Sequence, residues 1–344
     1  MDRARPAGIK DVADAAGVSV GTVSNVINRP DTVTDGTRRR VLGAIARLGY
    51  VRSESARQLR AGSSRMLGLL VLDLANPFFV ALASGAERSA RDAGLGVMVC
   101  DSAESTDEEA AYLTIFSEQR VRGVLVTPAD RTGHTLGILR HHGIPFVSVD
   151  RVVPSEDGCS VSVDDVTGGS LAVHHLLLGG HRSLAYISGP MHLTQCQERY
   201  EGGLAALAAA GLPPGTMRHI GAARLDVASG RDAGARLLGT QPLPTGVFCA
   251  NDLLALGVLQ ALYEAGVRVP EDVALVGYDD MEFAAAAAVP LTSVRQPARR
   301  MGELAAGLLI EETGEQAAGH RHRRIVLEPE LVVRASTLQP RRRA

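Results

Sequence analysis

The first fifty residues carry apolar side chains at the spacing of short helices. Between residues 9 and 16 these side chains recur at i, i+3, i+4 and i+7, which predicts an amphipathic helix that Gly17 ends. A later helix is predicted from a cap at Thr34 to Gly49, again with one apolar face. The inward residues expected for this later helix are Val41, Ile45 and Leu48.

A middle helix between these two has a small and polar outer face. Ser19 can cap it, and Val20, Val23 and Ile27 are expected to face inward. Two short helices joined by a tight turn with glycine form the helix-turn-helix unit, whose second helix enters the DNA major groove. Because no Lys or Glu occurs between residues 18 and 28, this face favours DNA binding over a solvated surface helix. The outward residues are Gly21, Thr22, Ser24, Asn25 and Asn28.

From residue 66 onward, apolar runs that fit buried strands alternate with segments that fit helices. This alternation predicts parallel sheets covered on both faces, and its repetition in the second half predicts two lobes. The expected strands are 66–73, 95–100, 123–126 and 145–149, then 184–187, 246–249 and 273–277. The expected helices lie near 78–93, 107–119, 133–142, 165–178, 199–210, 228–238 and 252–265.

Polar side chains follow several of these expected strands. Open parallel sheets bind ligands beyond the carboxyl ends of their strands, and carboxylate, amide and guanidinium groups together suit a polyhydroxylated ligand. A competing interpretation is that Asp or Asn at a strand end only caps the next helix, above all Asp252 and also Asp73 and Asp101. The candidate ligand-binding residues are Asp101, Asp150, Arg151, Arg199, Asn251 and Asp279, with Phe78, Phe79 and Phe283 over apolar faces.

Charge is distributed unevenly along the chain. The net charge is −2, yet residues 1–60 hold eleven Arg or Lys and six Asp or Glu, which makes this segment +5. A basic N-terminal segment followed by an acidic remainder indicates that the N-terminal segment binds a polyanion. The chain has no apolar run that would span a membrane and no signal-peptide core, so a cytoplasmic location is expected.

The cysteines and histidines form no metal-binding or redox motif in the sequence. The four cysteines lie far apart, which predicts reduced and mostly buried thiols, and Cys196 has no resolving cysteine nearby in the sequence. Neither His174-His175 nor the stretch 320–324, which is expected to be a solvated loop, predicts a metal site. No nucleophile elbow, Walker loop or dinucleotide fingerprint is visible, so neither an enzyme nor a cofactor is expected.

The motifs of the N-terminal segment resemble a known family. The run Ile-Lys-Asp-Val-Ala-Asp-Ala-Ala-Gly-Val-Ser-Val-Gly-Thr-Val-Ser-Asn-Val-Ile-Asn over residues 9–28, then Thr37-Arg38 and 48–50, is similar to the opening of the lactose/galactose-repressor (LacI) family. The resemblance continues in the body at 76–79, 150–151, 199, 251–252, 277–280, 291–297 and 331–336. It implies a small all-α helix-turn-helix headpiece followed by a two-lobed, periplasmic-binding-protein-like α/β domain with parallel sheets.

By this resemblance the headpiece would bind double-stranded, pseudo-palindromic operator DNA as part of a homodimer. The family most often has Arg at the position of Asn25, and since Asn suits adenine where Arg suits guanine, a changed base preference is expected. The hinge would fold on DNA, with Leu59 wedged in the minor groove. The DNA-contacting set would be Val20, Gly21, Thr22, Ser24, Asn25, Asn28, Thr37 and Tyr50, with Ala56, Arg57 and Leu59 from the hinge.

The resemblance also implies that a small effector binds between the lobes, with Arg199, Asn251 and Asp279 as its principal ligands. A sugar suits the polar set best, but Leu225 stands where the family often has an aromatic ring, so a nucleobase, amino-alcohol or phosphorylated sugar stays open. The expected domains are 1–50, a hinge at 51–62, a body at 63–338 and a tail at 339–344. The first lobe would comprise about 63–161 and 294–322, and the second 162–293 and 323–338.

Two other classes of protein compete with this interpretation. A solute-binding protein of a transport system has similar lobes, but it would need a signal peptide and no headpiece. A nucleotide-dependent enzyme would need a phosphate-binding glycine loop or an activated nucleophile. The C-terminal segment lacks an apolar heptad after residue 336, so a tetramer built on a coiled coil is not expected.

Overall fold

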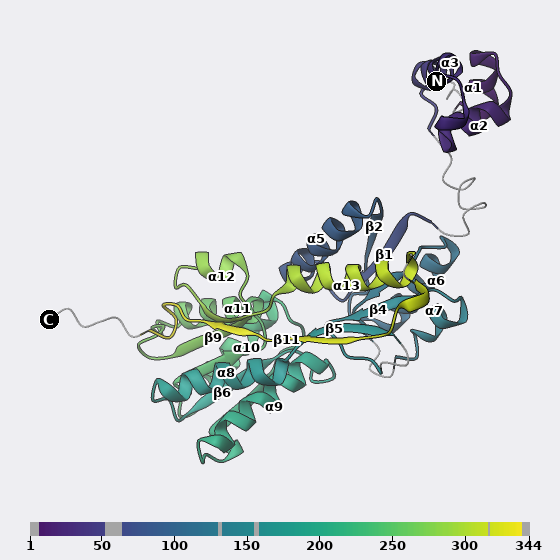
Figure 1. Cartoon of the computed structure of the whole chain (residues 1–344). Coiled ribbons are helices and arrows are strands. Elements are labelled where there is room, and N and C mark those ends of the chain that lie inside the picture. The colour runs from purple at the N-terminus through teal and green to yellow at the C-terminus, as the bar shows by residue number, and fades with distance from the viewer. Residues whose placement is uncertain (1–6, 52–63, 130–132, 155–157, 316, 339–344) are drawn as a thin grey trace. The chain divides into compact units, whose positions relative to one another are not determined.

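The N-terminal unit is built from helices packed on a small apolar core. In this computed structural model residues 7–51, 64–129, 133–154, 158–315 and 317–338 are described, and the chain divides into two units, Met1–Ser64 and Arg65–Ala344 (Figure 1). The helices of the first unit are α1 (Ile9–Ala16), α2 (Val20–Asn28), η1 (Pro30–Thr32) and α3 (Asp35–Leu48).

The ends of these helices follow the predicted signals. Gly17 and Gly49 both have left-handed backbones, with φ of 64° and 61°, and end α1 and α3 as expected. The Ser19 hydroxyl accepts a hydrogen bond from the Thr22 amide at 3.1 Å and so caps α2. Thr34 precedes α3, but its hydroxyl donates to the hydroxyl of Thr37 and not to a backbone group.

The core of the first unit differs from the predicted one at several positions. Val20 was expected to face inward, but it is the first residue of α2 and is 39% exposed. Val26 takes the inward position instead, beside the buried Val23. On α3 the buried residues include Ala44, whereas Leu48, at the open end of that helix, is 36% exposed.

The second unit holds two sheets of six strands, and all paired strands are parallel except β12. The first sheet has the order β11-β5-β4-β3-β1-β2 and the second β12-β10-β9-β8-β6-β7. The first is formed by β1 (Met66–Val71), β2 (Gly96–Asp101), β3 (Val124–Val126), β4 (Phe146–Val149), β5 (Cys159–Val163) and β11 (Arg324–Leu327). The second is formed by β6 (Leu184–Ser188), β7 (Met217–Gly221), β8 (Gly246–Cys249), β9 (Ala274–Asp279), β10 (Thr292–Arg295) and β12 (Glu330–Val332).

Helices cover both sheets, as the alternating pattern predicted. In the first lobe these helices are α5 (Pro77–Asp92), α6 (Thr106–Glu118), α7 (Gly137–His141) and α13 (Ala298–Thr313). In the second lobe they are α8 (Asp165–Leu178), α9 (Thr194–Ala209), α10 (Val227–Leu238), α11 (Asp252–Glu264) and α12 (Glu282–Ala286), with short 3-10 turns η2 (Pro214–Thr216) and η3 (Ala317–Gly319) elsewhere in the unit. No helix in the described part of the chain has the length and apolar character that crossing a bilayer requires.

The boundaries between the lobes differ from the predicted ones by a few residues. β5 runs to Val163 in the first sheet, so the first crossover follows residue 163 and not 161. β10 pairs with β9, which assigns residues 294 and 295 to the second sheet. β11, which was expected in the second lobe, pairs with β5 in the first, because its apolar residues extend that sheet before the chain crosses to β12.

Candidate effector site and DNA-binding face

A pocket lies where the two lobes of the second unit face each other. The carboxyl ends of β1, β2 and β4 supply its first-lobe wall, and residues from α9, α11 and β9 supply the opposite wall. This is the edge at which open parallel sheets bind ligands. The lining residues are Leu72, Asp73, Asn76, Phe78, Phe79, Glu104, Asp150, Gln195, Arg199, Leu225, Asn251, Asp279 and Gln296.

Arg199 is the buried cation of this pocket. Its Nε donates to Oδ1 of Asp165 at 2.7 Å, and its Nη1 donates to the carbonyl of Ala250 at 2.6 Å. The guanidinium carbon lies 3.6 Å from the centroid of the Tyr278 ring, and Nη1 lies 4.0 Å from Oδ1 of Asp279. Burial opposes the charge on Arg199, but Asp165, Tyr278 and Asp279 raise its pKa above the usual value, so the guanidinium stays charged.

Two glycines bring Arg199 to its partner. A Cβ on Gly169 of α8 would lie 2.0 Å from the carbonyl oxygen of Arg199, and one on Gly202 of α9 would lie 1.9 Å from that of Val166. The absence of side chains at both positions lets α8 and α9 pack backbone against backbone. Asp165, in the first turn of α8, therefore reaches the guanidinium of Arg199 on α9.

Asp279 ends β9 inside the pocket, in an unusual backbone conformation. Its φ is 99°, and its Oδ1 accepts a hydrogen bond from Nε2 of Gln296 at 2.7 Å. Burial raises the pKa of Asp279 to about 6, although Arg199 and hydrogen bonds from Gln296 and Asn76 act in the opposite direction. Asn76 belongs to the first lobe and lines the same pocket, so the two walls approach each other at Asp279.

Asp150 presents an unsatisfied acceptor to the same pocket. Its backbone is left-handed, with φ of 62°, and its Oδ1 is buried with no hydrogen-bond partner among the described residues. Burial and the negative charges of Asp165 and Asp279 raise the pKa of Asp150 well above its usual value, and Arg199 lowers it. A buried acceptor without a donor is costly, so this oxygen is placed to accept a hydrogen bond from a ligand.

Asn251 lines the pocket, but the protein already uses both ends of its amide. Oδ1 accepts from the Leu254 amide at 2.9 Å, so Asn251 is the cap of α11, and Nδ2 donates to the Leu225 carbonyl at 3.0 Å. Asp252 was expected to be that cap. Instead, the Asp252 carboxylate accepts hydrogen bonds from the Met281 amide at 2.8 Å and from the Ser293 hydroxyl at 2.7 Å. These bonds hold the loop after β9 in place.

Three predicted binding residues lie outside the pocket lining. Asp101 accepts from the amides of Leu74 and Ala103, at 2.9 and 2.8 Å, and so holds two loops beside the pocket. Arg151 donates to the Thr194 hydroxyl at 2.8 Å, which joins the lobes. Phe283 packs against the first-lobe core, because its apolar ring finds more apolar contact there than in the polar pocket.

Several lining residues were not among the predicted ligands. Asn76 was noted only as part of a motif, where it caps α5 by accepting from the Phe78 amide at 3.0 Å. Glu104 comes from a loop that carries no distinctive local pattern, and Gln296 was noted only as part of the segment 291–297. Leu225 was noted as standing where the family often has an aromatic ring, but neither it nor Gln195 was among the predicted ligands. A rule that takes whole loops after parallel strands, and not only their first polar residue, would have found Glu104.

The outer face of α2 is small and polar in the structure, as the sequence predicted. Gly21, Asn25 and Asn28 are exposed, and Val20 joins them, whereas Thr22 is partly buried. The Asn28 amide donates to the Ser24 carbonyl at 2.8 Å and to its hydroxyl at 3.2 Å, so it folds back on α2. The other DNA candidates of this unit, Thr37 and Tyr50, are partly buried. The hinge candidates Ala56, Arg57 and Leu59 lie outside the described residues.

The cysteines are free, and all except the half-buried Cys100 are buried. Burial raises the pKa of the Cys196 thiol to about 12, so it stays protonated and unreactive at neutral pH. His175 contacts the Thr337 hydroxyl at 2.8 Å, and burial lowers its pKa, so it is a neutral structural residue.

A helix-turn-helix unit followed by two parallel-sheet lobes around a polar pocket defines a class of DNA-binding regulators with a ligand-responsive body. Residues 8–53 match the model of the bacterial regulatory proteins, lacI family, and residues 173–337 match the periplasmic binding protein-like domain. The HTH-type transcriptional repressor PurR of Photobacterium profundum is 34% identical over 329 residues, which are 95% of this chain and 98% of the relative.

Two solved structures extend this similarity. The lac repressor dimer bound to operator and the anti-inducer ONPF is 28% identical, covers 97% of this chain and 100% of its own, and has a TM-score of 0.85. The transcriptional regulator CelR-cellobiose complex is 34% identical, covers 96% of this chain and 99% of its own, and has a TM-score of 0.72. The chain belongs to the lacI family of bacterial regulatory proteins; it is a DNA-binding transcriptional repressor and not an enzyme.

Proposed function

We propose that this repressor is controlled by a neutral, polyhydroxylated effector, a sugar, that binds in the pocket between the lobes. The observation that carries the proposal is the pair of unsatisfied acceptors in the pocket. Oδ1 of Asp150 and Oε1 of Gln296 are both buried, and neither has a hydrogen-bond partner among the described residues. Sugar hydroxyls supply donors to such oxygens and accept from neighbouring amides in return.

The charge of the lining residues favours a neutral sugar over a phosphorylated one. Four carboxyl groups, those of Asp73, Glu104, Asp150 and Asp279, line the pocket together with one guanidinium. That guanidinium is already paired with Asp165, so a phosphorylated sugar would meet more negative than positive charge. Phe78, Phe79 and Leu225 offer apolar surface for the C–H faces of a sugar ring. CelR, a similar protein, binds cellobiose in its solved complex.

The DNA-binding part of the proposal rests on the exposed face of α2 and on family membership. Val20, Gly21, Ser24 and Asn25 would read base edges in the major groove, and Thr22 and Thr37 would hold phosphates. Asn28 and Tyr50 would lie at the margin of the same face. Two copies would bind a pseudo-palindromic operator, as the lac repressor dimer does in its complex with operator. Ala56, Arg57 and Leu59 would enter the minor groove.

Effector control would act through the arrangement of the lobes. The pocket takes Asn76 and Asp150 from the first lobe and Arg199 and Asp279 from the second, so a ligand that contacts both walls favours one arrangement. The ligand can shift the equilibrium only by its difference in affinity for the two arrangements. A repressor of this kind works where the chromosomal DNA is, which in a bacterium is the cytoplasm.

The experiment is a binding screen on the full-length chain, with neutral sugars, sugar phosphates and nucleobases as probes. Thermal shift gives the ligands, because a compound that binds the folded state raises the melting temperature, and calorimetry gives their affinities. Fluorescence anisotropy with palindromic DNA, at several salt concentrations, then measures how each ligand changes operator affinity. We expect a neutral sugar to bind and to change the DNA affinity.

Asp150→Asn tests the site, because it keeps the shape of the side chain and replaces the unsatisfied carboxylate oxygen. We expect it to weaken sugar binding by roughly tenfold, the value of one hydrogen bond of about 1.5 kcal/mol. The control is Asp232→Asn, which changes an exposed carboxylate on α10 and leaves binding unchanged. A sugar affinity that Asp150→Asn leaves equal to that of the parent would refute the pocket, and binding of a phosphate ester or nucleobase alone would refute the effector class.

A further inference from the structure

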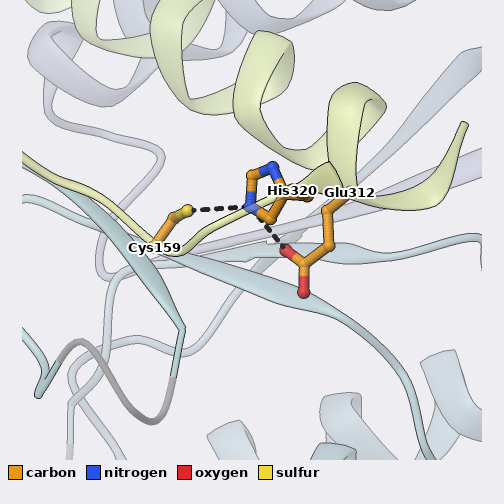
Figure 2. Close-up of side chains that lie close together, drawn as sticks. All are labelled: Cys159, Glu312 and His320. Carbon is orange, nitrogen blue, oxygen red and sulfur yellow. Dashed lines mark hydrogen bonds and ion pairs between the residues drawn. The ribbon is translucent and has the colours of Figure 1, made fainter. Parts of the chain in front are cut away.

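A second group of reactive side chains lies in the first lobe, away from the pocket. Cys159 begins β5, Glu312 belongs to the last turn of α13, and His320 lies between η3 and β11 (Figure 2). One ligand atom from each residue, the Sγ, a carboxylate oxygen and a ring nitrogen, fits within 4.8 Å of the other two. The group lies at the amino end of β5, whereas the effector pocket lies at the carboxyl ends of the strands.

The spacing of these atoms suits a tetrahedral metal ion. Sγ of Cys159 lies 3.3 Å from Nε2 of His320, and that Nε2 lies 3.8 Å from Oε2 of Glu312 (Figure 2). Zinc bonds of about 2.3 Å to sulfur and about 2.0 Å to nitrogen or oxygen place neighbouring ligands about 3.5 Å apart in a tetrahedron. The remaining pair, Sγ of Cys159 and the Glu312 carboxylate, lies within 4.8 Å, so adjustments of about an ångström in the side chains would bring the three atoms onto one ion.

Outer groups hold these side chains in orientations that expose their lone pairs to the common centre. Glu311 Oε2 lies 3.7 Å from Nδ1 of His320, which favours the tautomer with Nε2 unprotonated. Nε2 of His322 lies 3.2 Å from Oε1 of Glu312 and leaves Oε2 facing Cys159 and His320. The Arg323 amide donates to Sγ of Cys159 at 3.3 Å, an interaction that suits a thiolate.

Two further observations distinguish this group from a surface cluster of polar residues. His320, expected in a solvated loop, is only 4% exposed, and Cys159 is fully buried. Oε2 of Glu312 is buried and has no hydrogen-bond partner among the described residues. The sequence did not indicate this site, because Glu312 and His320 lie 153 and 161 residues after Cys159. No short spacing of metal ligands is therefore visible.

We propose that Cys159, His320 and Glu312 form a binding site for Zn²⁺ or a similar borderline divalent ion. A thiolate, an imidazole and a carboxylate are ligands that zinc accepts together, and water would complete the tetrahedron. The ion would displace the thiol proton of Cys159 to solvent, so each binding event releases one proton from sulfur. It would tie the amino end of β5 to α13 and to the segment that enters β11.

Cobalt is the first probe, because Co²⁺ bound to a thiolate gives a charge-transfer band and tetrahedral Co²⁺ gives intense d–d bands. The full chain, free of affinity tag and treated with chelator under reducing conditions, is titrated with Co²⁺ and then with Zn²⁺. We expect one Co²⁺ per chain with both sets of bands and their loss when Zn²⁺ displaces Co²⁺. Absence of the charge-transfer band at saturating Co²⁺ would overturn the proposal.

Variants identify the ligands. Cys159→Ser should abolish the charge-transfer band, and His320→Gln, which retains Cys159, should weaken Zn²⁺ binding at least tenfold in a competition with a chromophoric chelator. His322→Ala removes an outer partner, and loss of such a partner typically costs about 10–100-fold in affinity. The controls Cys100→Ser and His142→Ala change a thiol and an exposed imidazole elsewhere and should bind as the parent does. Circular dichroism checks that each variant folds, and a band that persists in folded Cys159→Ser refutes the site.

Discussion

Asp165 and Arg199, which are 34 residues apart in the sequence, form a buried ion pair with 2.7 Å between Oδ1 and Nε. Each side chain is at most 4% exposed, and Arg199 lines the pocket beside Asp279. The guanidinium also covers the Tyr278 ring. The pair therefore joins α8, α9 and the end of β9, and the geometry of the pocket depends on it.

Loss of one partner of this pair should destabilise the body strongly. Asp165→Asn leaves the guanidinium of Arg199 buried without its carboxylate, and breaking a buried pair in this way costs about 3–5 kcal/mol. We expect the unfolding free energy to fall by that amount and effector binding to weaken, because Arg199 loses its fixed orientation. Urea unfolding followed by circular dichroism measures the first effect.

The double variant Asp165→Asn with Arg199→Met gives the control. Since it removes both charges, it should be less destabilised than the sum of the two single variants, with a coupling of about 0.5–3 kcal/mol. Additive effects would show that the two residues contribute independently and that the ion pair has no structural role.

The free energy of unfolding should depend on pH because Asp279 titrates with a raised pKa. Its pKa is about 6 in the folded chain, compared with 3.8 for an ordinary aspartate, so the folded state favours the protonated form. The stability that this group contributes is complete below about pH 4 and is lost as pH rises to about 6. A shift of about two units corresponds to roughly 3 kcal/mol. Urea unfolding between pH 4 and 7 measures the loss.

Asp279→Asn should flatten this part of the pH profile, because an amide cannot titrate. Asp272→Asn is the matched control, since Arg268 lowers the pKa of that exposed aspartate to about 2 and its contribution changes only below pH 4. If the profile of Asp279→Asn between pH 4 and 6 equals that of the parent, another group is responsible for the dependence.

The close packing of α8 on α9 gives a further prediction. Gly169→Ala would place a Cβ 2.0 Å from the Arg199 carbonyl oxygen, so the helices must separate, at a cost of about 1–3 kcal/mol. Gly307→Ala in α13 is the control, because nothing lies within 4 Å of its Cβ position and alanine is the better helix former. Thermal unfolding should show a lower melting temperature for the first variant and an equal or higher one for the second. Equal effects would mean that the helices are not in backbone contact.

The order of strands and helices was readable from the sequence because most strands here are buried on both faces and therefore apolar. The strands that escaped prediction lack that signal. In β5, Ser160 and Ser162 alternate with apolar residues, although the whole strand is buried. β7 contains the exposed Arg218 and His219, and β11 alternates exposed and partly buried residues at a sheet edge.

The pocket was predictable only where its residues follow strands directly. Asp150 and Asp279 were found in this way, because a parallel sheet aligns the ends of its strands. Phe283 was misassigned because a ring beside a strand end can face either the pocket or the opposite lobe, and only packing decides between them. The partnership of Asp165 with Arg199 depends on how α8 meets α9, which no local pattern encodes.

Asn25 lies on the exposed face of α2 and gives the prediction on DNA sequence. Its amide can pair bidentately with the N6 and N7 of adenine, whereas arginine in its place would pair with the O6 and N7 of guanine. We therefore expect the parent to prefer adenine at one position of each half-site, and Asn25→Arg to change this preference to guanine. A bidentate contact is worth about 1–3 kcal/mol of discrimination, or roughly five- to 150-fold in affinity.

A library of palindromic operators, varied one base pair at a time and bound at fixed salt concentration, measures this preference. Thr37→Ser is the control, because a residue that only contacts phosphate should affect all operators equally. A change of preference confined to one base pair of each half-site would identify the position that Asn25 reads. Guanine preferred at that position by the parent, with the preference lost in Asn25→Ala, would refute the assignment. In that case Asn25 would itself favour guanine, and the amide would have to donate to the base and not pair with adenine.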